Sequence, residues 1–132
     1  MKIVINSLCA GLNLSLAAAL HYAKLCGFEL FPVVEVKNKY VPYEDGMNCP
    51  YGPIYLTKPL TAEGEFQEGA FFHLGYIKRN DPHLVATIEQ MGDQASRQGS
   101  LLKVVVIPEG VDWAVREHDE KERVEEKQRV WG

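Results

Sequence analysis

Two segments of the chain share one order of residues: a short apolar run, a polar turn, and then an amphipathic helical pattern. The first is the run Lys2 to Ile5 with a helix after Ser15, and the second is Ala70 to Ile77 with a helix at Asp81-Pro82. Another strand-like run follows each of them: Phe28 to Val36 and Leu101 to Ile107. Because right-handed crossovers return each strand beside the last, this order predicts a small α/β sandwich with a mixed, mainly parallel sheet and two main helices.

Both predicted helices carry end signals. Ser15 can accept a hydrogen bond from a free amide as an N-cap, and Gly27 stands where a left-handed C-terminal residue belongs. In the second helix Asp81 is the N-cap, Pro82 is the first helical residue and Gly92 is the end. The apolar spacing between these signals predicts a helix in each place.

The segment from Lys37 to Gly69 differs in composition from its surroundings, since four of the seven prolines lie in it. It also holds four tyrosines: Tyr40, Tyr43, Tyr51 and Tyr55. It is too long for a plain connection, so we expect an excursion from a single domain of residues 1–132, with a short strand at Pro53 to Thr57. Its tyrosines could stack a planar ligand, or they could cover a sheet edge or an oligomer interface.

Charge and composition exclude several classes of protein. The 132 residues are 46% hydrophobic, which is ordinary for one globular domain, and the net charge of −4 without a basic block argues against binding of duplex nucleic acid. No apolar stretch has the length of a membrane span or a signal peptide, so we expect a cytoplasmic protein. The three cysteines and four histidines show no metal-ligand spacing, and we expect no metal and no cofactor.

Ligands of open α/β sheets bind beyond the carboxyl ends of parallel strands, near helix N-termini. Three polar segments should then converge: Asn6 with Ser7, Arg79 with Asn80 and Asp81, and Glu109 with Asp112. The sequence therefore predicts a pocket that binds its ligand through Asn6, Ser7, Gly11, Tyr51, Tyr55, Arg79 and Asn80. The candidates for a catalytic acid, base or nucleophile are Asp81, Glu109 and Asp112.

Several of these residues also have a structural interpretation. Asn6 and Ser7 can satisfy backbone groups of a turn, and Gly11 lacks the companions of a phosphate-binding loop. Asp81 is explained by the helix start, whereas Arg79 has no such explanation. Binding is therefore favoured over catalysis. In the C-terminal part, the mixed charges from Glu117 to Arg129 fit either a solvated helix or the arms of a polar hairpin.

Four motifs are carried by both ends and the second half of the chain: KIVINS with Gly11 and Leu14-Ser15, RNDP with Leu84-Val85 and EQMG, LKVV with IPEGVDW, and EKQRVW. In these residues the chain resembles a family of small uncharacterised proteins of bacteriophages and prophages. Members usually carry Gly-Gly and aromatic-Asp-Gly where this chain has Ala10-Gly11 and His118-Asp119-Glu120. The resemblance implies a C-terminal β-hairpin over Val111 to Trp131 and the cytoplasm of a bacterial host, without an established activity.

Three functions remain open at this point. The first is a phage accessory protein that sequesters a small anionic or nucleotide-like host metabolite or defence signal. The second is a nucleotide-processing hydrolase or glycosyl-transfer enzyme that uses the same pocket. The third is a factor that binds a host protein through the Tyr/Pro excursion. A homo-oligomer is compatible with all three.

Overall fold

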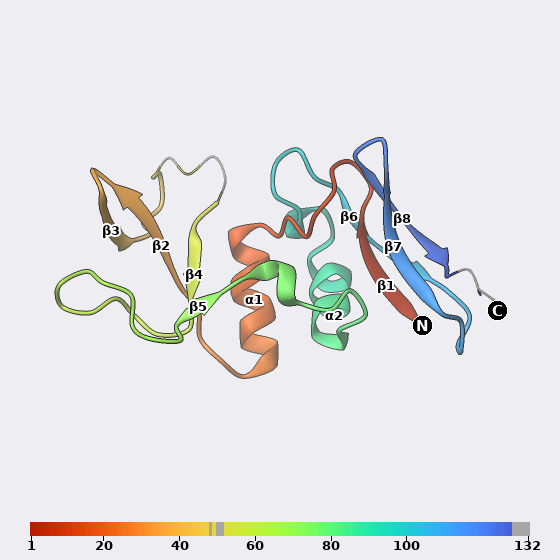
Figure 1. Ribbon diagram of the computed structural model, residues 1–132, viewed down its shortest axis with the longest axis horizontal. Helices are drawn as coiled ribbons and strands as arrows, with labels where there is room; N and C mark the ends of the chain where they lie inside the picture. Colours follow the sequence, from red (N-terminus) through yellow and green to blue (C-terminus); the bar gives the residue numbers. More distant parts are fainter. Residues whose placement is uncertain (48, 50–51, 128–132) are drawn as a thin grey trace, which may run out of the picture.

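The computed structural model describes residues 1–47, 49 and 52–127 (Figure 1). Its strands are β1 Lys2–Asn6, β2 Phe31–Val36, β3 Lys39–Pro42, β4 Ile54–Leu56, β5 Phe71–Phe72, β6 Leu102–Val106, β7 Trp113–His118 and β8 Lys121–Glu126. Its helices are α1 Leu16–Cys26 and α2 Pro82–Met91, with 3₁₀ turns η1 Leu74–Tyr76 and η2 Gly92–Ala95.

The strands form three sheets, in the orders β1-β6, β3-β2-β4-β5 and β7-β8. Every strand pairing in the described part of the chain is antiparallel, so the predicted mainly parallel sheet is wrong. The chain does not return to β1 after α1. It enters β2 and turns back at once through Lys37 and Asn38, whose φ angles are 52° and 65°, into β3. A tight turn of this kind joins antiparallel neighbours, and β2 thereby becomes part of a separate sheet.

The predicted helix ends are confirmed. The Ser15 hydroxyl accepts from the Ala18 N–H at 3.2 Å, and Gly27 closes α1 with φ 89°. One carboxylate oxygen of Asp81 accepts from the N–H groups of His83 and Leu84 at 2.8 and 3.3 Å. Side-chain caps of this type contribute about 1 kcal/mol each.

The predicted strand from Ala70 to Ile77 is only partly correct. The strand β5 ends after Phe72, because His73 accepts the Gly75 N–H through Nδ1 at 3.0 Å and begins the turn η1. The short strand expected within Pro53 to Thr57 is confirmed as β4.

The helix α1 lies at the centre of the molecule, between the four-stranded sheet and α2 (Figure 1). Ala18 and Tyr22 belong to a core shared with α2, β1 and β6. Ala19 and Ala23 belong to a second core with Leu30 and Tyr55, on the side of the four-stranded sheet. Small alanines on both sides of α1 let two layers approach it closely.

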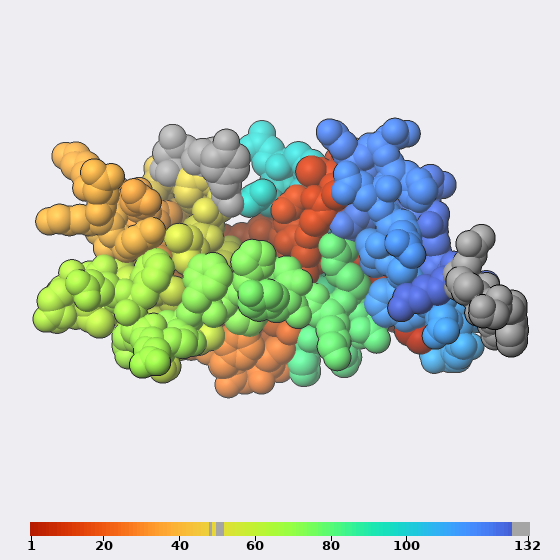
Figure 2. Space-filling model, viewed as in Figure 1, coloured from red at the N-terminus to blue at the C-terminus, as the bar shows by residue number. Residues whose placement is uncertain are grey.

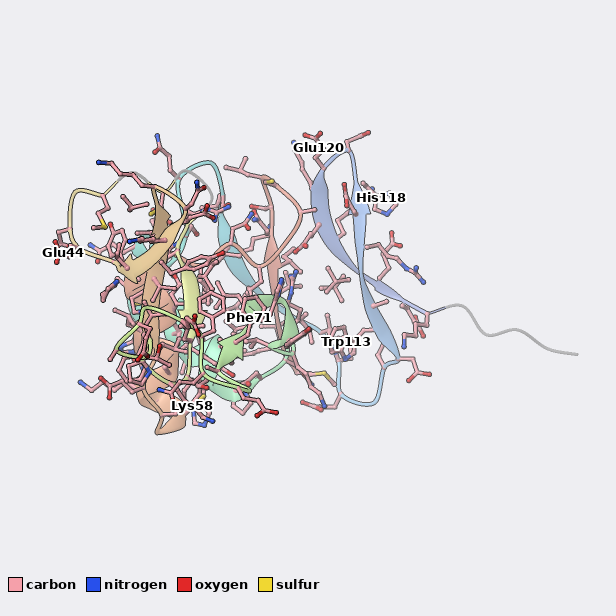
Figure 3. All side chains as sticks on the ribbon, turned by 60° about the vertical axis from the view of Figure 1, so that its left-hand side comes forward. Glu44, Lys58, Phe71, Trp113, His118 and Glu120 are labelled. Carbon is pink, nitrogen blue, oxygen red and sulfur yellow. The ribbon has the colours of Figure 1, made fainter. Side chains whose placement is uncertain are left out.

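The C-terminal segment is a hairpin, and the alternative of a helix is wrong. Val115 pairs with Val124 in the β7–β8 ladder. The turn between them has positive φ at Asp119 and Glu120, 52° and 65°. Figure 3 shows His118 and Glu120 at this tip and Trp113 near the other end. Trp131, the end of the predicted hairpin segment, lies outside the described residues.

Candidate functional site

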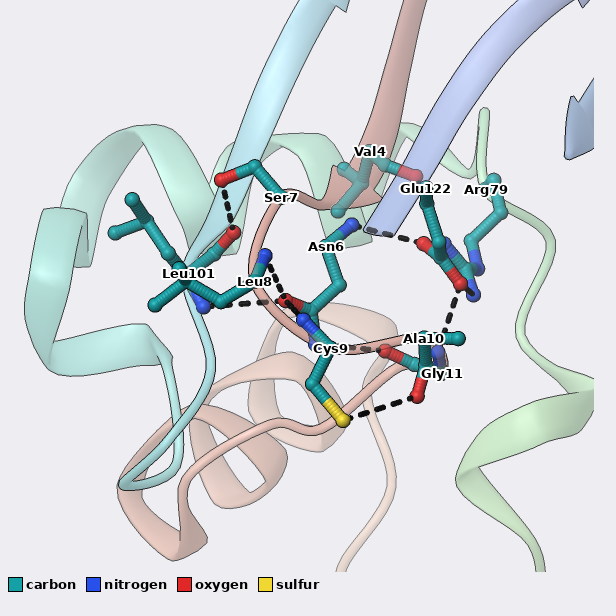
Figure 4. A network of polar contacts seen from close by, with 10 residues as sticks. All are labelled: Val4, Asn6, Ser7, Leu8, Cys9, Ala10, Gly11, Arg79, Leu101 and Glu122. Atoms are coloured by element: carbon teal, nitrogen blue, oxygen red, sulfur yellow. Dashed lines mark hydrogen bonds and ion pairs between the residues drawn. The ribbon is translucent and has the colours of Figure 1, made fainter. Parts of the chain in front are cut away.

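The loop after β1 is organised by the side chain of Asn6, which is completely buried. Its Oδ1 accepts from the N–H groups of Leu8, Cys9 and Leu101 at 3.1 to 3.2 Å. Its Nδ2 donates to the carbonyl of Gly11 at 3.1 Å (Figure 4). Asn6 therefore uses both ends of its amide to hold the loop, and its structural interpretation is the one that the contacts support.

The side chain of Glu122 reaches from β8 into the same loop. Its Oε1 accepts from the Asn6 N–H at 2.8 Å, and its Oε2 accepts from the Gly11 N–H at 2.7 Å. The guanidinium of Arg79 donates to both carboxylate oxygens, at 2.6 and 2.9 Å. The two side chains are only 6% and 18% exposed, so Glu122 and Arg79 form a bidentate and largely buried ion pair.

Arg79 and Glu122 also bind backbone groups at the outer edge of β1. The Val4 N–H donates to the Arg79 carbonyl at 2.8 Å, and the Val4 carbonyl accepts from the Arg79 guanidinium at 3.1 Å. The Asn6 N–H is bound by Glu122, as described above. Backbone and side-chain groups thus replace the strand that would otherwise pair with this edge.

Two opposing effects set the pKa of Glu122. Burial raises it, whereas the hydrogen bonds from Arg79 and from the N–H groups of Gly11 and Asn6 lower it, together with the charge of Arg79. The hydrogen bonds and the charge of Arg79 outweigh the effect of burial, so the pKa of Glu122 lies below its ordinary value. The carboxylate is charged at neutral pH and stays paired.

The three predicted segments do not form one pocket. Because β1 and β6 are antiparallel, with Lys2 opposite Val106, the residues that follow β6 lie beside the start of β1. The Glu109 carboxylate accordingly lies 3.0 Å from the N-terminal amine of Met1. Asn6 lies at the opposite end of β1. Antiparallel pairing therefore separates the segments that a parallel sheet would have brought together.

The other predicted residues have identifiable places. Asp81 caps α2 and accepts a hydrogen bond from the Tyr22 hydroxyl at 2.8 Å. Ser7 donates to the Leu101 carbonyl at 3.1 Å, and Asn80 is exposed. Asp112 is exposed and lines a different hollow, beside the β7–β8 hairpin. Tyr51 lies outside the described residues.

A cleft of about 500 Å³ lies between the N-terminal loop and the four-stranded sheet. Figure 2 shows the face on which the red N-terminal loop, the yellow β4 and the green β5–η1 segment meet. Of the predicted ligand residues, Gly11 and Tyr55 line this cleft. The other polar and aromatic lining residues were not predicted from the sequence: Asn13, Phe71, Phe72, His73 and Arg97.

Three aromatic side chains form an exposed row that begins in the cleft lining with Phe71 and His73 and continues to Tyr76. The rings of Phe71 and His73 lie 6.1 Å apart, and those of His73 and Tyr76 lie 5.2 Å apart. Phe71 is 55% exposed and Tyr76 is 79% exposed. The sequence signal for this row is the group of aromatic residues around Gly75, but a continuous strand would have placed Tyr76 on the face opposite to Phe71 and His73.

Arg97 brings positive charge to the cleft. Burial raises the pKa of the Tyr55 phenol to about 12, and the charge of Arg97 acts against that rise. The backbone of Arg97 is fixed by its N–H, which donates to the Asn13 carbonyl at 3.0 Å. The cleft therefore combines a mainly apolar wall with the positive charge of Arg97 and the buried side chain of Tyr55.

No protein-family model matches this chain, and no curated protein or solved structure matches it. The resemblance to phage proteins accordingly stays a prediction. Within residues 1–47, 49 and 52–127, no helix has the length and apolar character needed to cross a membrane. The same residues contain no group of three or more His, Cys, Asp or Glu side chains that could hold a metal ion.

Proposed function

We propose that the protein binds a small ligand in which a planar ring is joined to a negatively charged group, such as a nucleotide. The proposed site is the cleft between the N-terminal loop and the β4–β5 edge. One cleft is lined both by exposed aromatic side chains, those of Phe71 and His73, and by the positively charged Arg97. This combination supports the proposal.

Stacking would hold the planar part of the ligand. Phe71 leaves more than half of its surface exposed and lies next to His73, so a ring placed on this wall would cover apolar surface on both partners. Stacking of a base on an aromatic side chain contributes about 1 to 3 kcal/mol and tolerates different bases. His73 accepts through Nδ1, so its neutral ring carries the proton on Nε2, which can donate to a ligand.

Positive electrostatic potential in the cleft would hold the negatively charged group of the ligand. Arg97 supplies a full positive charge, and it lines the same cleft as Tyr55, whose pKa this charge lowers. Leu14 and Leu16, on either side of the N-cap of α1, also line the cleft. The first amides of a helix lack intrahelical acceptors and favour anions, so this end of α1 adds to the same potential.

The positions of the aspartate and glutamate residues support ligand binding over catalysis. Among the described residues that line the cleft, none is an aspartate or a glutamate. Asp81 is used by the helix cap, and Glu109 contacts the N-terminal amine. Sequestration needs no acid or base. In the phage setting that the sequence resemblance implies, the ligand would be a host metabolite or defence signal, bound in the bacterial cytoplasm.

One observation favours a second candidate, which is a factor that binds a host protein. Tyr76 extends the row of aromatic side chains away from the cleft and is 79% exposed. Exposed aromatic rings are enriched at protein interfaces. A protein partner would cover Tyr76, whereas a small ligand in the cleft would not need it.

The test measures thermal unfolding with a panel of nucleotides, ADP-ribose and cyclic dinucleotides, followed by analysis of the small molecules after denaturation. A ligand bound to the native state raises the melting temperature by mass action. Recovery of the intact compound supports sequestration, and recovery of a converted product would mean an enzyme. Absence of any shift would contradict the proposal and favour a protein partner.

Substitutions of residues that line the cleft test whether the ligand binds there. We expect Phe71→Ala and Arg97→Gln each to weaken binding by about 10-fold or more, since each removes one kind of contact. The matched controls are Phe66→Ala and Arg116→Gln, whose side chains are exposed outside the cleft. Equal losses in the test and control variants would place the ligand elsewhere.

A further inference from the structure

In the part of the chain that the structure describes, β6 pairs with β1 alone, and its outer edge has no strand beside it. Met1 and Ile107 exchange two backbone hydrogen bonds of 2.8 Å, and the Ser7 N–H donates to the Leu101 carbonyl at 2.8 Å. Antiparallel pairs alternate between bonded and non-bonded positions. The odd-numbered residues of β6 therefore bond to β1, and the N–H and C=O groups of Val104 and Val106 point away from it.

This open edge is short and has defined ends. At one end, the Leu102 N–H is already bound by the Ser96 hydroxyl at 2.8 Å. At the other end, Pro108 has no N–H to donate. Between them, the described residues supply no hydrogen-bond partner for the outward groups of Val104 and Val106. Val106 is 70% exposed, so water reaches this edge.

The two edges of the β1–β6 sheet differ in whether their outward backbone groups have hydrogen-bond partners. At the outer edge of β1, Arg79 and Glu122 bind the N–H and C=O of Val4 and the N–H of Asn6. The outer edge of β6 presents unpaired backbone groups next to apolar side chains, which is a template for another strand. A two-stranded sheet is also less stable than a sheet with more strands.

We propose that this edge pairs with the same edge of a second copy of the chain, antiparallel, with Val105 of one copy opposite Val105 of the other. In this register Val104 of each copy exchanges hydrogen bonds with Val106 of the other. Leu102 faces Pro108, and neither has a free N–H. The two β1–β6 sheets join into one four-stranded sheet around a two-fold axis.

A second copy fits because the edge is self-complementary. Val104 and Val106 supply all the backbone donors and acceptors of the new strand pairing. Leu102 and Pro108, which have no free N–H, face each other in this register alone. Valine lies opposite valine along the axis, which is a favourable cross-strand pair. Lys103 faces Ile107 of the second copy, so like charges are not placed opposite one another.

The first test is the oligomeric state. Sedimentation equilibrium from low micromolar to millimolar concentration should give a mass that rises from 14.9 kDa toward twice this value. Val106→Pro removes an outward N–H and no hydrogen bond to β1, so we expect a folded monomer at all concentrations. Val106→Thr keeps the N–H and a β-branched side chain, and it should dimerise like the wild type. A wild type that is monomeric throughout, or a Val106→Pro protein that still dimerises, would overturn the proposal.

The second test fixes the register and does not depend on the proline variant. In a Cys9→Ser background, which removes the exposed cysteine, Val105→Cys should form a disulfide-linked dimer under mild oxidation. Non-bonded antiparallel pairs have Cα atoms about 4.5 Å apart, within the range of a disulfide. Val106→Cys should not cross-link, because it faces Val104. Cross-linking through position 106 in place of 105 would contradict the register and the proposal.

Discussion

The guanidinium of Arg79 and the carboxylate of Glu122, 43 residues apart in the sequence, form a bidentate ion pair with distances of 2.6 and 2.9 Å. Through this pair the C-terminal hairpin is connected to the segment before α2. Through the bonds of Glu122 to Asn6 and Gly11, it is also connected to the first loop. A single carboxylate thereby holds three distant segments around the end of β1.

Removal of Glu122 should destabilise the protein strongly. We expect Glu122→Ala to lower the free energy of unfolding by about 3 to 5 kcal/mol, because it leaves the Arg79 charge buried without its partner. Urea denaturation measures the change. The matched control is Glu89→Ala, which breaks the exposed ion pair with Lys2 and should cost less than about 1 kcal/mol. Similar losses in both variants would contradict a structural role for Glu122.

The pH dependence of stability should carry a contribution from Glu122. Its pKa is lowered from 4.5 in the folded state, so its contribution is complete above pH 4.5 and is lost as the pH falls through the folded pKa. In the Glu122→Gln variant, the amide side chain has no proton to gain or lose over this pH range. The difference in unfolding free energy between wild type and Glu122→Gln should therefore shrink below pH 4.5, as measured by urea denaturation at several pH values. A constant difference would exclude the lowered pKa.

Asn6→Ala should destabilise the protein without a direct effect on ligand contacts. The change removes the hydrogen bonds that the buried Asn6 side chain makes with three backbone amides and with the Gly11 carbonyl, so we expect a loss of about 2 to 4 kcal/mol. The control is Asn80→Ala, since Asn80 is exposed and should contribute within about 0.5 kcal/mol. Thermal and urea unfolding decide between this role and a ligand contact, for which Asn6→Ala would keep full stability.

Gly75→Ala tests the aromatic row beside the cleft. A Cβ at position 75 would lie 2.9 Å from Nδ1 of His73, so the imidazole must move and its bond to the Gly75 N–H is weakened. We expect weaker binding of the ligand found in the panel and a loss of about 1 kcal/mol in stability. In a His73→Ala background the same substitution should have little further effect. A full second loss in that background would show that the clash lies elsewhere.

Local signals in the sequence predicted several elements correctly. Ser15 and Gly27 mark the ends of α1, and Asp81-Pro82 and Gly92 mark those of α2, because caps satisfy backbone groups within a few residues. The sequence did not predict how the strands pair. A strand-helix-strand order fits parallel crossovers, but the turn at Lys37 and Asn38 directs β2 into a separate antiparallel sheet.

The predicted convergence of three polar segments was wrong for the same reason, because antiparallel pairing places the residues after β6 beside the start of β1. Asn6 and Arg79 both contact Glu122, and no local signal indicated that this residue, far along the chain, would pair with Arg79. The cleft residues His73 and Arg97 belong to segments that meet only after α1 has packed between two layers.

The beginnings and ends of the helices could be predicted from the chain alone, since capping signals depend on residues that are neighbours in the sequence. Strand pairing, the buried ion pair and the position of the cleft became known only from the folded molecule. These features depend on contacts between segments that are distant in the sequence, and local propensity does not encode them.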